Sequence, residues 1–510
     1  MDNRIKYFIP RISNRLLVYN TFYNLLGNIL PLLAGLISIP IMIHKMGVDR
    51  FGILALVWMI VGYFSIFDLG MGRATTKFVA EYLSLDKLAD LPRLIWTSVI
   101  SVSALGLAGG IALAFVTPWL VERTFNIPPE LWGETKKAFY VMAVGIPFVL
   151  STTCLNGILE AQQRFGLINA IRTPASILNY VAPLPVLLFS QSLYLITAML
   201  VISRFLVWLA FSYFIFRDFL DVRFPSKPSL EHLKQLWRFG GWLTVSNLVG
   251  PIIVYMDRFL IGSLLTMQAV AYYIIPYELV TKLWIIPASL TPVLFPVFSA
   301  YASEQEPKLA ALHQRAVKYI FLILAPFIIG VLVFAQPFLS FWISPEFGAE
   351  STLLMQLLAL GVLVNALAWV PVSAIEAMNR PDLPAKLHLL ELPVFLGILW
   401  LSLKIMGLIG AALVWVLRVS IDAGLLFWLM HYLMPSKATH YGEFGRGCIL
   451  NIIILTAAVL FSIMIPSLTV KLVLLPAIVI GYAWLSWKYL LDVSEKEILL
   501  SRINLDKSSK

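Results

Sequence analysis

Long apolar runs, separated by short polar connections, make up most of the chain. Each run is long enough for a helix to cross the hydrocarbon core of a bilayer, which takes about 20 residues. The longest connection, Arg217 to Gly240, is too short to fold into a soluble domain. The pattern therefore predicts an all-α, polytopic membrane protein with about fourteen transmembrane helices. We expect the spans at residues 16–43, 53–70, 94–121, 138–159, 173–190, 193–216, 241–265, 270–300, 319–343, 352–377, 388–406, 407–432, 447–466 and 471–491.

Composition agrees with this interpretation. Of the 510 residues, 60% are hydrophobic and 13% are charged, whereas soluble domains average about 25% charged residues. The first apolar run follows a polar, basic segment and is too long for the apolar region of a secretory signal, so we expect no removable leader. Cys154 and Cys448 both lie in apolar runs, and two thiols predict neither a disulfide framework nor a metal cluster.

Lys and Arg are distributed unevenly over the connections. If the N-terminal segment is inside, the inner segments hold 26 of the 38 basic residues and the outer connections hold 7. Cytoplasmic connections of membrane proteins carry such an excess. We therefore expect both termini in the cytoplasm and an even number of spans. The net charge of +10 has the same explanation and requires no nucleic-acid partner.

A short charged segment is repeated along the chain. EAQQR (Glu160–Arg164) ends one apolar run, and EAMNR (Glu376–Arg380) ends another six spans later. An even separation gives both halves the same orientation, as in transporters built from parallel repeats. Chance similarity between apolar helices is the alternative. Nearly the same difference in residue number separates Asn28 from Asn247, Tyr82 from Tyr301 and Arg204 from Arg418.

The repeat predicts a division of the chain into four parts. Residues 1–216 would form a lobe of six helices and residues 241–432 a second such lobe, with a central cavity between them, as in alternating-access transporters. Residues 433–510 would add two helices and a cytoplasmic tail. The connection at 217–240 would join the lobes on the cytoplasmic side.

The connection between the lobes contains the motif PSLEHLKQLWRFG. Ser229 is a plausible N-cap, because a serine side chain can accept a hydrogen bond from the first turn of a helix. Leu230, Leu233 and Trp237 would then share one apolar face. This pattern predicts an amphipathic helix that lies along the inner membrane surface.

Basic side chains inside the predicted spans are the most informative polar residues. Each costs about 2.5–3.5 kcal/mol at the centre of a membrane helix, so such residues usually face an internal cavity or a partner. Arginine suits phosphate, since its planar guanidinium group can donate two hydrogen bonds at once. A cavity lined by these cations predicts an anionic substrate such as a diphosphate. The four cations are Arg204, Arg258, Lys282 and Arg418.

Two of the cations have an acidic residue within reach on the same helix. Lys282 follows Glu278 by four residues, and Arg418 precedes Asp422 by four, so each pair can meet on one helix face. Such local ion pairs are the structural alternative to a place in the cavity. The other two cations lack a local partner of this kind.

Amides form a polar stripe on the first span. Asn20, Asn24 and Asn28 recur every four residues, and Ser246 and Asn247 occupy the matching seventh span. One interpretation is a polar cavity wall that contacts sugar hydroxyls. The other is hydrogen bonding between neighbouring helices, worth about 0.6–2 kcal/mol each in membranes.

Two segments are candidate gates. Residues 270–300 contain four prolines, which predict a kinked helix. In this segment Tyr277 and Trp284 could stack on sugar rings, although such residues also form interfacial belts. In FDLGMGRATTKFVAEY, Asp68 and Arg73 flank two glycines. That motif fits either a gating latch or a plain helix corner with a salt bridge.

Three places in the chain resemble the polysaccharide flippases, O-antigen type, of the multidrug/oligosaccharidyl-lipid/polysaccharide (MOP) exporter superfamily. They are HKMGVDRFGILAL followed by FDLGMGRATTKFVAEY, then MDRFLIGSLLTMQAVAYYIIPYELV, and EAQQRF. The resemblance covers most of the chain through residue 432. One departure is SLLTMQAV, where relatives usually carry glycines in the turn between spans seven and eight.

The resemblance implies a flippase in a bacterial cytoplasmic (inner) membrane, with two lobes around a cationic cavity. It would move an undecaprenyl-diphosphate-linked oligosaccharide from the inner to the outer leaflet for polysaccharide biosynthesis, by alternating access. Arg204, Arg258, Lys282 and Arg418 would contact the diphosphate. Asn24, Asn28, Asn247 and Tyr277 complete the candidate substrate-binding residues.

No cofactor or metal is expected, and coupling to H⁺ or Na⁺ is open. Glu278 is the candidate ion-coupling residue, with pairing to Lys282 as its alternative role. The expected partners are the lipid-linked oligosaccharide, membrane lipids, and the glycan polymerase and glycosyltransferases of the same pathway.

Two other classes of function are alternatives to a flippase. An ion-coupled multidrug or organic-cation antiporter of the same superfamily needs carboxylates in the membrane, but residues 16–43 contain no Asp or Glu. A membrane enzyme such as a glycan polymerase usually places its catalytic residues on a sizeable outer loop, and the outer connections here are short. The sequence therefore favours transport over catalysis.

Overall fold

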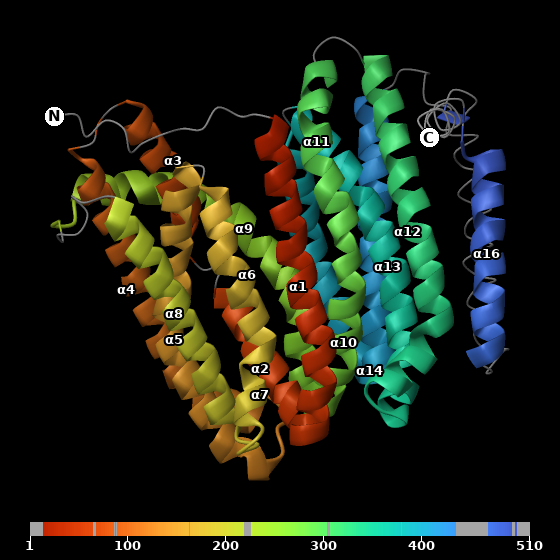
Figure 1. Cartoon of the computed structure of the whole chain (residues 1–510), viewed down its shortest axis with the longest axis horizontal. Helices are drawn as coiled ribbons and strands as arrows, with labels where there is room; N and C mark the ends of the chain where they lie inside the picture. The colour runs from red at the N-terminus through yellow and green to blue at the C-terminus, as the bar shows by residue number, and fades with distance from the viewer. Residues whose placement is uncertain are drawn as a thin grey trace, which may run out of the picture. The chain divides into compact units, whose positions relative to one another are not determined.

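The chain is helical and divides into two compact units, a first unit of residues 1–271 and a second unit of residues 272–510 (Figure 1). Every regular element in the described residues is a helix, which confirms the predicted all-α class. Eight of these helices are long and apolar enough to cross a membrane. Within some helices only the backbone is described, residues 14–29 and 239–250 among them. The computed structural model describes residues 14–64, 68–85, 89–162, 164–218, 226–302, 306–378, 380–434 and 468–491, and also Lys87, Glu495 and Lys496.

The first unit is a helix bundle in which α5 packs along both α4 and α8. Apolar runs form helices in lipid because each backbone N–H and C=O group must find its partner within the segment. On α4 the side chains of Leu107, Ile111 and Phe115 recur every four residues and are all exposed, as expected of a face in contact with lipid. The helices are α1 (Asn14–Met46), α2 (Val48–Phe64), α3 (Met71–Ser84), α4 (Leu91–Trp119), α5 (Trp132–Ala161), α6 (Phe165–Val181), α7 (Pro183–Val186), α8 (Leu193–Asp218), α9 (Leu230–Leu264) and the start of α10 (Met267–Thr281).

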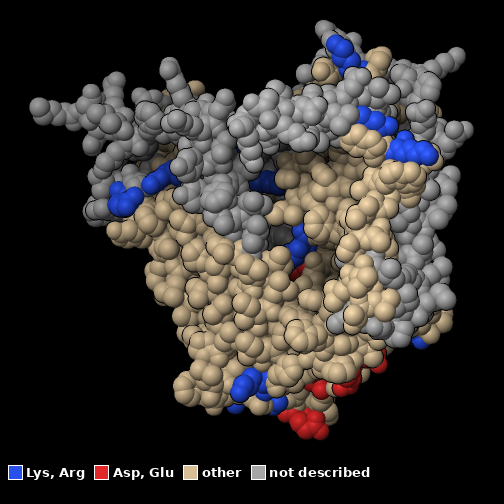
Figure 2. Space-filling model, turned by 45° about the vertical axis from the view of Figure 1, so that its right-hand side comes forward, with Lys and Arg blue, Asp and Glu red and all other residues tan. Residues whose placement is uncertain are grey.

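The surface shows the same separation of charge from apolar residues. Figure 2 shows wide areas of the described surface that carry no Lys, Arg, Asp or Glu side chain. Such uncharged surface is expected where a protein faces hydrocarbon, since charged residues at bilayer depth are rare.

Small residues allow α4 and α5 to approach closely. A Cβ atom added to Gly106 would lie 2.6 Å from Cα of Pro147, and one added to Gly110 would lie 2.5 Å from the carbonyl oxygen of Ala143. Both glycines lie on one face of α4, one turn apart, in the small-xxx-small arrangement that brings membrane helices together. The contact is backbone to backbone, so there is no flexible side chain that could move aside.

The corner between α2 and α3 is held by one carboxylate. Asp68 accepts hydrogen bonds from the amides of Gly70 (3.0 Å) and Gly72 (2.9 Å) and from the hydroxyl of Thr153 on α5 (3.0 Å). Gly70 has a φ of 70°, in the left-handed region that glycine adopts without a steric penalty. Of the two alternatives, the helix corner is present, but the described residues show no salt bridge between Asp68 and Arg73, because amides and a hydroxyl occupy the carboxylate.

The second unit is organised around α13, which packs against α11, α12 and α14. The predicted boundary between two spans at residues 406 and 407 is confirmed, since α14 is broken at Gly407, where φ is 60°. The predicted proline-rich span is also interrupted, by a 3-10 turn (Lys282–Trp284) between α10 and α11. The predicted span 447–466 lies outside the described residues. The helices are α11 (Ile285–Ala302), α12 (Glu306–Trp342), α13 (Pro345–Ala377), α14 (Asp382–Leu433) and α16 (Leu468–Tyr489).

The predicted linker helix is continuous with the span that follows it. A single helix, α9, runs from Leu230 to Leu264, and the side chain of Ser229 accepts from the amide of His232, which confirms the N-cap. Leu230 and Trp237 are exposed on the described surface, while Leu236 is buried against the unit. The apolar face is therefore free to contact lipid, and the place of the helix at the membrane surface stays a prediction. The four-part division of the chain also stays a prediction.

We predict that Gly106→Ala and Gly110→Ala each lower the stability of the protein by about 1–3 kcal/mol, because the added methyl group is forced against the backbone of α5. Gly330→Ala on α12 is the control, since no atom lies within 4 Å of the position of its Cβ. It should be neutral or stabilise by up to about 1 kcal/mol. Thermal unfolding of the purified protein in detergent measures the difference, and equal melting temperatures for all three variants would contradict the packing argument.

We predict that Asp68→Ala destabilises the protein by about 1–2 kcal/mol, because two N-terminal amides of α3 and one hydroxyl of α5 lose their acceptor. Asp90→Ala is the matched control. Asp90 also precedes a helix, but its side chain makes no capping hydrogen bond. The same unfolding measurement checks both variants, and an Asp68→Ala protein as stable as the control would show that the corner does not depend on this carboxylate.

Candidate functional site

A cavity of about 410 Å³ lies in the first unit, where α3, α5, α6 and α8 come together. Arg73 reaches it from the first turn of α3, Arg172 from α6 and Arg204 from the middle of α8. Glu160, in the last turn of α5, and Asp68, at the corner before α3, supply two carboxylates. With all five groups ionised, the cavity carries a formal charge of +1.

Both carboxylates at the cavity are engaged with neutral partners. Asp68 accepts the three hydrogen bonds of the α2–α3 corner. Oε1 of Glu160 accepts from Nδ2 of Asn156 at 2.6 Å. Among the described residues, neither carboxylate is within ion-pair distance of an arginine. The positive charge of the cavity is therefore not neutralised by a direct contact.

Two of the three arginines have no partner in the described part of the protein. Arg73 and Arg172 are exposed along the cavity and form no hydrogen bond or ion pair with any described residue. Each guanidinium group has five N–H donors that can bind a ligand. Unoccupied donors at a cavity are typical of a site that binds an anion.

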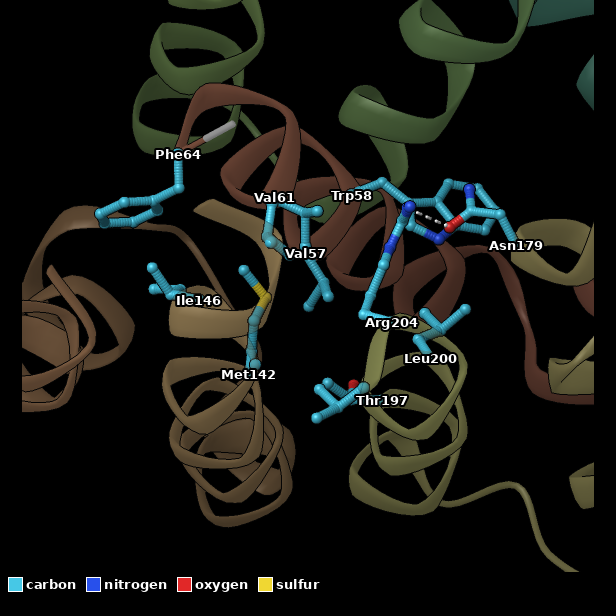
Figure 3. A pocket seen from close by; sticks show the side chains of 13 residues that line it. Val57, Trp58, Val61, Phe64, Met142, Ile146, Asn179, Thr197, Leu200 and Arg204 are labelled. Atoms are coloured by element: carbon cyan, nitrogen blue, oxygen red, sulfur yellow. Dashed lines mark hydrogen bonds between the residues drawn. The ribbon is translucent and has the colours of Figure 1, made fainter. Parts of the chain in front are cut away.

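The third arginine is held in position by an amide. Nη2 of Arg204, on α8, donates to Oδ1 of Asn179, on α6, at 3.0 Å (Figure 3). This single hydrogen bond to a neutral group orients the guanidinium without cancelling its charge. Figure 3 shows the side chain extending from α8 toward Asn179, beside the indole of Trp58.

Arg204 lies between the polar cavity and a second pocket whose walls are mainly apolar. It borders a second, much smaller pocket of about 20 Å³, which is otherwise lined mainly by apolar side chains such as Val57, Val61, Met142 and Ile146. On one side of Arg204 the walls are polar and roomy, and on the other they are apolar and nearly closed. A charged ligand would therefore find mainly polar walls on the side of the larger cavity and mainly apolar walls beyond Arg204.

The remaining predicted residues of the first unit lie elsewhere or outside the described side chains. Arg258, on α9, is 5% exposed, and its guanidinium lies over the ring of Tyr255 at 5.2 Å. It does not line the arginine cavity. Asn24, Asn28 and Asn247 belong to α1 and α9, but their side chains lie outside the described part of the chain.

In the second unit, Lys282 pairs with Glu278 at 3.4 Å, so the local ion pair that the spacing allowed is present. Both side chains are about two-fifths exposed. Tyr277 is buried, with its ring edge-on to those of Trp284 and Trp415. An ion-coupling role for Glu278 and a sugar contact for Tyr277 stay predictions.

Arg418 does not form the ion pair with Asp422 that the spacing allowed as an alternative. Nε of Arg418 lies 3.5 Å from Oε2 of Glu391, and Oδ1 of Asp422 lies 3.3 Å from Nε2 of His388. Both partners belong to the first half of α14, which folds back beside the second half at the Gly407 break. A local i, i+4 rule cannot detect a partner that a chain reversal supplies.

Sequence reasoning missed Arg172 at the cavity and Glu391 in the second unit. Arg172 lies one residue before the predicted span 173–190 and so falls in a predicted connection, whereas α6 begins at Phe165. Glu391 lies inside a predicted span, where an acidic residue is as costly as a basic one. A search for acids as well as cations within spans would have found it.

Comparison with known proteins agrees with this architecture. The family model described as "Polysaccharide biosynthesis protein" matches residues 17–302. A protein of Shigella flexneri named "Putative O-antigen transporter" is 30% identical over 417 residues, which are 81% of this chain and 97% of the relative.

Solved structures share the fold. An inward-facing multidrug resistance MATE family transporter of the MOP superfamily is 16% identical, with a TM-score of 0.63, over 84% of this chain and 98% of its own. The lipid II flippase MurJ, in an inward closed conformation, is 13% identical with a TM-score of 0.63, over 93% of this chain and all of its own. From the family match and the Shigella relative, we conclude that this chain belongs to the polysaccharide biosynthesis protein family, a family of membrane transporters with the MOP-superfamily fold.

Proposed function

We propose that the protein is a flippase that moves an undecaprenyl-diphosphate-linked oligosaccharide from the inner to the outer leaflet of a bacterial cytoplasmic membrane. The observation that carries the proposal is the cavity of the first unit. Arg73 and Arg172 have no hydrogen-bond partner among the described residues there, and Arg204 is held toward it by an amide. Three guanidinium groups around one cavity suit a diphosphate, which offers several oxygens to bidentate donors.

The size of the cavity limits what it recognises. A volume of about 410 Å³ falls in the range of sites that hold a small molecule. A long glycan does not fit, so recognition falls on the diphosphate and the sugars next to it. The rest of the glycan extends into water, and the polyprenyl chain stays in lipid. Such a flippase would accept glycans that differ beyond the first sugars.

The relatives support a lipid-linked glycan as substrate. The Shigella protein is named for O-antigen transport and MurJ for flipping lipid II. The alternating exposure of a binding site to the two sides of the membrane fits the inward-facing and inward closed states of the solved structures. We further propose that the glycosyltransferases and the polymerase of the same polysaccharide pathway are functional partners of the protein.

The corner between α2 and α3 is suited to act as a gate of the cavity. Asp68 fastens the start of α3 to α5 through three neutral hydrogen bonds, and Arg73 lies one turn further on at the cavity. A phosphate that binds Arg73 would therefore pull on the first turn of α3. In this proposal the corner transmits occupancy of the cavity to the helix ends.

An antiporter for organic cations shares the fold but not the chemistry of this cavity. A cationic drug would meet three guanidinium groups and two carboxylates that are already hydrogen-bonded. Like charges without a neutralising partner repel, and more strongly at low dielectric. The cavity of the first unit therefore favours an anion over a cation.

We predict that Arg172→Ala and Arg204→Ala each reduce export of the glycan about 10- to 100-fold at limiting substrate, since a hydrogen bond to a charged group contributes about 1.5–3 kcal/mol. Export is measured as surface polysaccharide in cells whose own flippase gene is deleted. Arg93→Ala is the control, because Arg93 is exposed at the start of α4 and lies outside the cavity.

Arg172→Lys should restore part of the activity, because lysine keeps the charge but not the bidentate geometry. Immunoblots establish that all variants are present at equal levels in the membrane. Normal export in both alanine variants would remove these arginines from the substrate path.

We predict that a single cysteine at Lys227 is labelled from the cytoplasm and one at Gln268 from outside, in a background without Cys154 and Cys448. Both positions are exposed, and they lie before α9 and after it. An impermeant maleimide, added to intact cells and then to opened cells, distinguishes the two sides. Labelling of Gln268 only in opened cells would show that the predicted topology is wrong.

A further inference from the structure

A second cavity, of about 420 Å³, lies at the opposite end of α2 from the arginine cavity. Three connections of the first unit meet there, those between α1 and α2, α4 and α5, and α9 and α10. Because a helix rises 1.5 Å per residue, α2 is about 25 Å long. That is most of the thickness of the hydrocarbon core, so the two cavities lie near opposite membrane surfaces. We call this cavity the outer pocket, since the distribution of Lys and Arg predicts that it faces outward.

Polar side chains from all three connections line the outer pocket. Asp49 lies in the first turn of α2, and Asn126 lies between α4 and α5. Thr266 and Gln268 come from the turn into α10. Binding sites for small molecules combine a few such polar groups with apolar walls. The apolar part of the lining is Ile127, Pro128 and Met267.

The walls of the outer pocket are joined through the backbone. The amide of Asn126 donates to the carbonyl oxygen of Gly262, on α9, at 2.9 Å. A Cβ atom added to Gly52, on α2, would collide with the carbonyl oxygen of Met267, so the backbones of α2 and the turn are in contact. The pocket is therefore preformed, which lowers the entropy that is lost when a ligand binds.

The polar groups of the outer pocket have capacity left for a ligand. Nε2 of Gln268 donates to Oδ2 of Asp49 at 3.0 Å, and Oγ1 of Thr266 accepts from the amide of Ala269 at 3.1 Å. Oδ1 of Asp49, Oε1 of Gln268 and the side-chain amide of Asn126 have no partner among the described residues. Donors and acceptors thus lie side by side, as a ligand with many hydroxyl groups requires.

Charge distinguishes the outer pocket from the arginine cavity. Of the described residues that line it, only Asp49 is ionisable, and it carries a negative charge. Arg50, the next residue, is paired with Glu134 at 3.3 Å. A diphosphate would therefore be repelled, whereas the hydroxyl groups of a sugar can donate charge-assisted hydrogen bonds to the carboxylate.

A divalent cation suits the outer pocket less well than a sugar does. Ca²⁺ takes about 6–8 oxygen ligands, most often with carboxylates among them. Asp49 is the one carboxylate in the described lining. No group of three or more His, Cys, Asp or Glu in the described part of the chain is placed to hold a metal ion.

The turn between α9 and α10 supplies much of this lining. It lies in SLLTMQAV, the segment in which the sequence departs from the flippases that it resembles. Thr266, Met267 and Gln268 provide side chains where glycine would provide none. The outer pocket therefore depends on this chain's own sequence, as expected of a site that distinguishes one glycan from another.

We propose that the outer pocket is a saccharide-binding site, which takes sugar units of the glycan without the diphosphate. The hydroxyl groups of the sugar would bond to Asp49 and Asn126, and its C–H faces would pack on the apolar wall. The role of the pocket in transport rests on the proposed flippase function. After the lipid-linked glycan has crossed the membrane, this site would hold its sugars on the outer side and slow its return.

The test uses one reporter at each cavity. The full chain is labelled with fluorotryptophan and reconstituted in lipid nanodiscs. The ¹⁹F resonances of Trp132 and Trp58 are assigned by their loss in Trp132→Phe and Trp58→Phe. Nε1 of Trp132 donates to the carbonyl oxygen of Ile127, in the wall of the outer pocket, at 2.9 Å. Trp58 lies beside Arg204, at the arginine cavity.

Two probes are titrated separately. The first is the oligosaccharide unit of the source strain's own surface polysaccharide, cleaved from its lipid and free of phosphate. We expect it to shift the resonance of Trp132 and to reach saturation, whereas inorganic pyrophosphate should shift Trp58 and leave Trp132 unchanged. Asp49→Ala should weaken the affinity for the oligosaccharide about tenfold or more, because a hydrogen bond to a charged group is lost. Asn126→Ala should weaken it about threefold or more, because the lost hydrogen bond is neutral.

Glu130→Ala is the matched control. Glu130 is an exposed acidic residue in the same connection as Asn126 but does not line the outer pocket, so the affinity should be unchanged. A resonance of Trp132 that does not respond to the oligosaccharide would overturn the proposal. So would equal affinities in Asp49→Ala, Asn126→Ala and the control. A response to CaCl₂ in place of the oligosaccharide would identify a cation site and would also overturn it.

If Asp49→Ala does not fold, Asn126→Ala decides the outcome against the same control. The titration is independent of the export assay, because the oligosaccharide carries no phosphate. Failure of the arginine variants in that assay would remove the diphosphate site and leave the binding of sugar at Trp132 intact. Failure of the titration at Trp132 would leave the flippase proposal intact without a sugar site at the outer pocket.

Discussion

The constraint on which the rest of this structure depends is the cost of placing a charged side chain at membrane depth. The protein meets that cost in different ways. The guanidinium group of Arg204 borders a cavity and takes one amide partner, and that of Arg258 lies over a tyrosine ring. Arg418 pairs with Glu391, supplied by a chain reversal at Gly407. Only the first solution leaves the charge available to a ligand.

The cavity of the first unit is kept open by the way its charged groups are paired. Had Asp68 and Glu160 turned toward the arginines, the cavity would contain salt bridges and fewer free donors. Instead each carboxylate is bound by neutral groups of its own surroundings, amides and a hydroxyl for Asp68 and an amide side chain for Glu160. The neutral hydrogen bonds to the two carboxylates thus leave the arginines of the cavity without an acidic partner among the described residues.

The two units carry opposite imbalances of charge. The first unit has a roomy cavity with an excess of positive charge, and the second has an enclosed cluster with an excess of negative charge.

The lengths of the apolar runs predicted the all-α membrane fold, since a segment that must satisfy its backbone in lipid has few alternatives to a helix. The break at Gly407 and the corner before α3 could also be predicted from the sequence. The same holds for the choice of Arg204 as a candidate substrate-binding residue. These features are local, or they follow from the cost of a single residue. The partners of the charges were not visible. The ion pair of Arg418 with Glu391, the hydrogen bond from Thr153 to Asp68 and the place of Arg172 and Arg204 at one cavity involve residues that are far apart in the chain. Only the packing of helices against one another decides such contacts, because the spacing along one helix says nothing about the helix that will lie beside it.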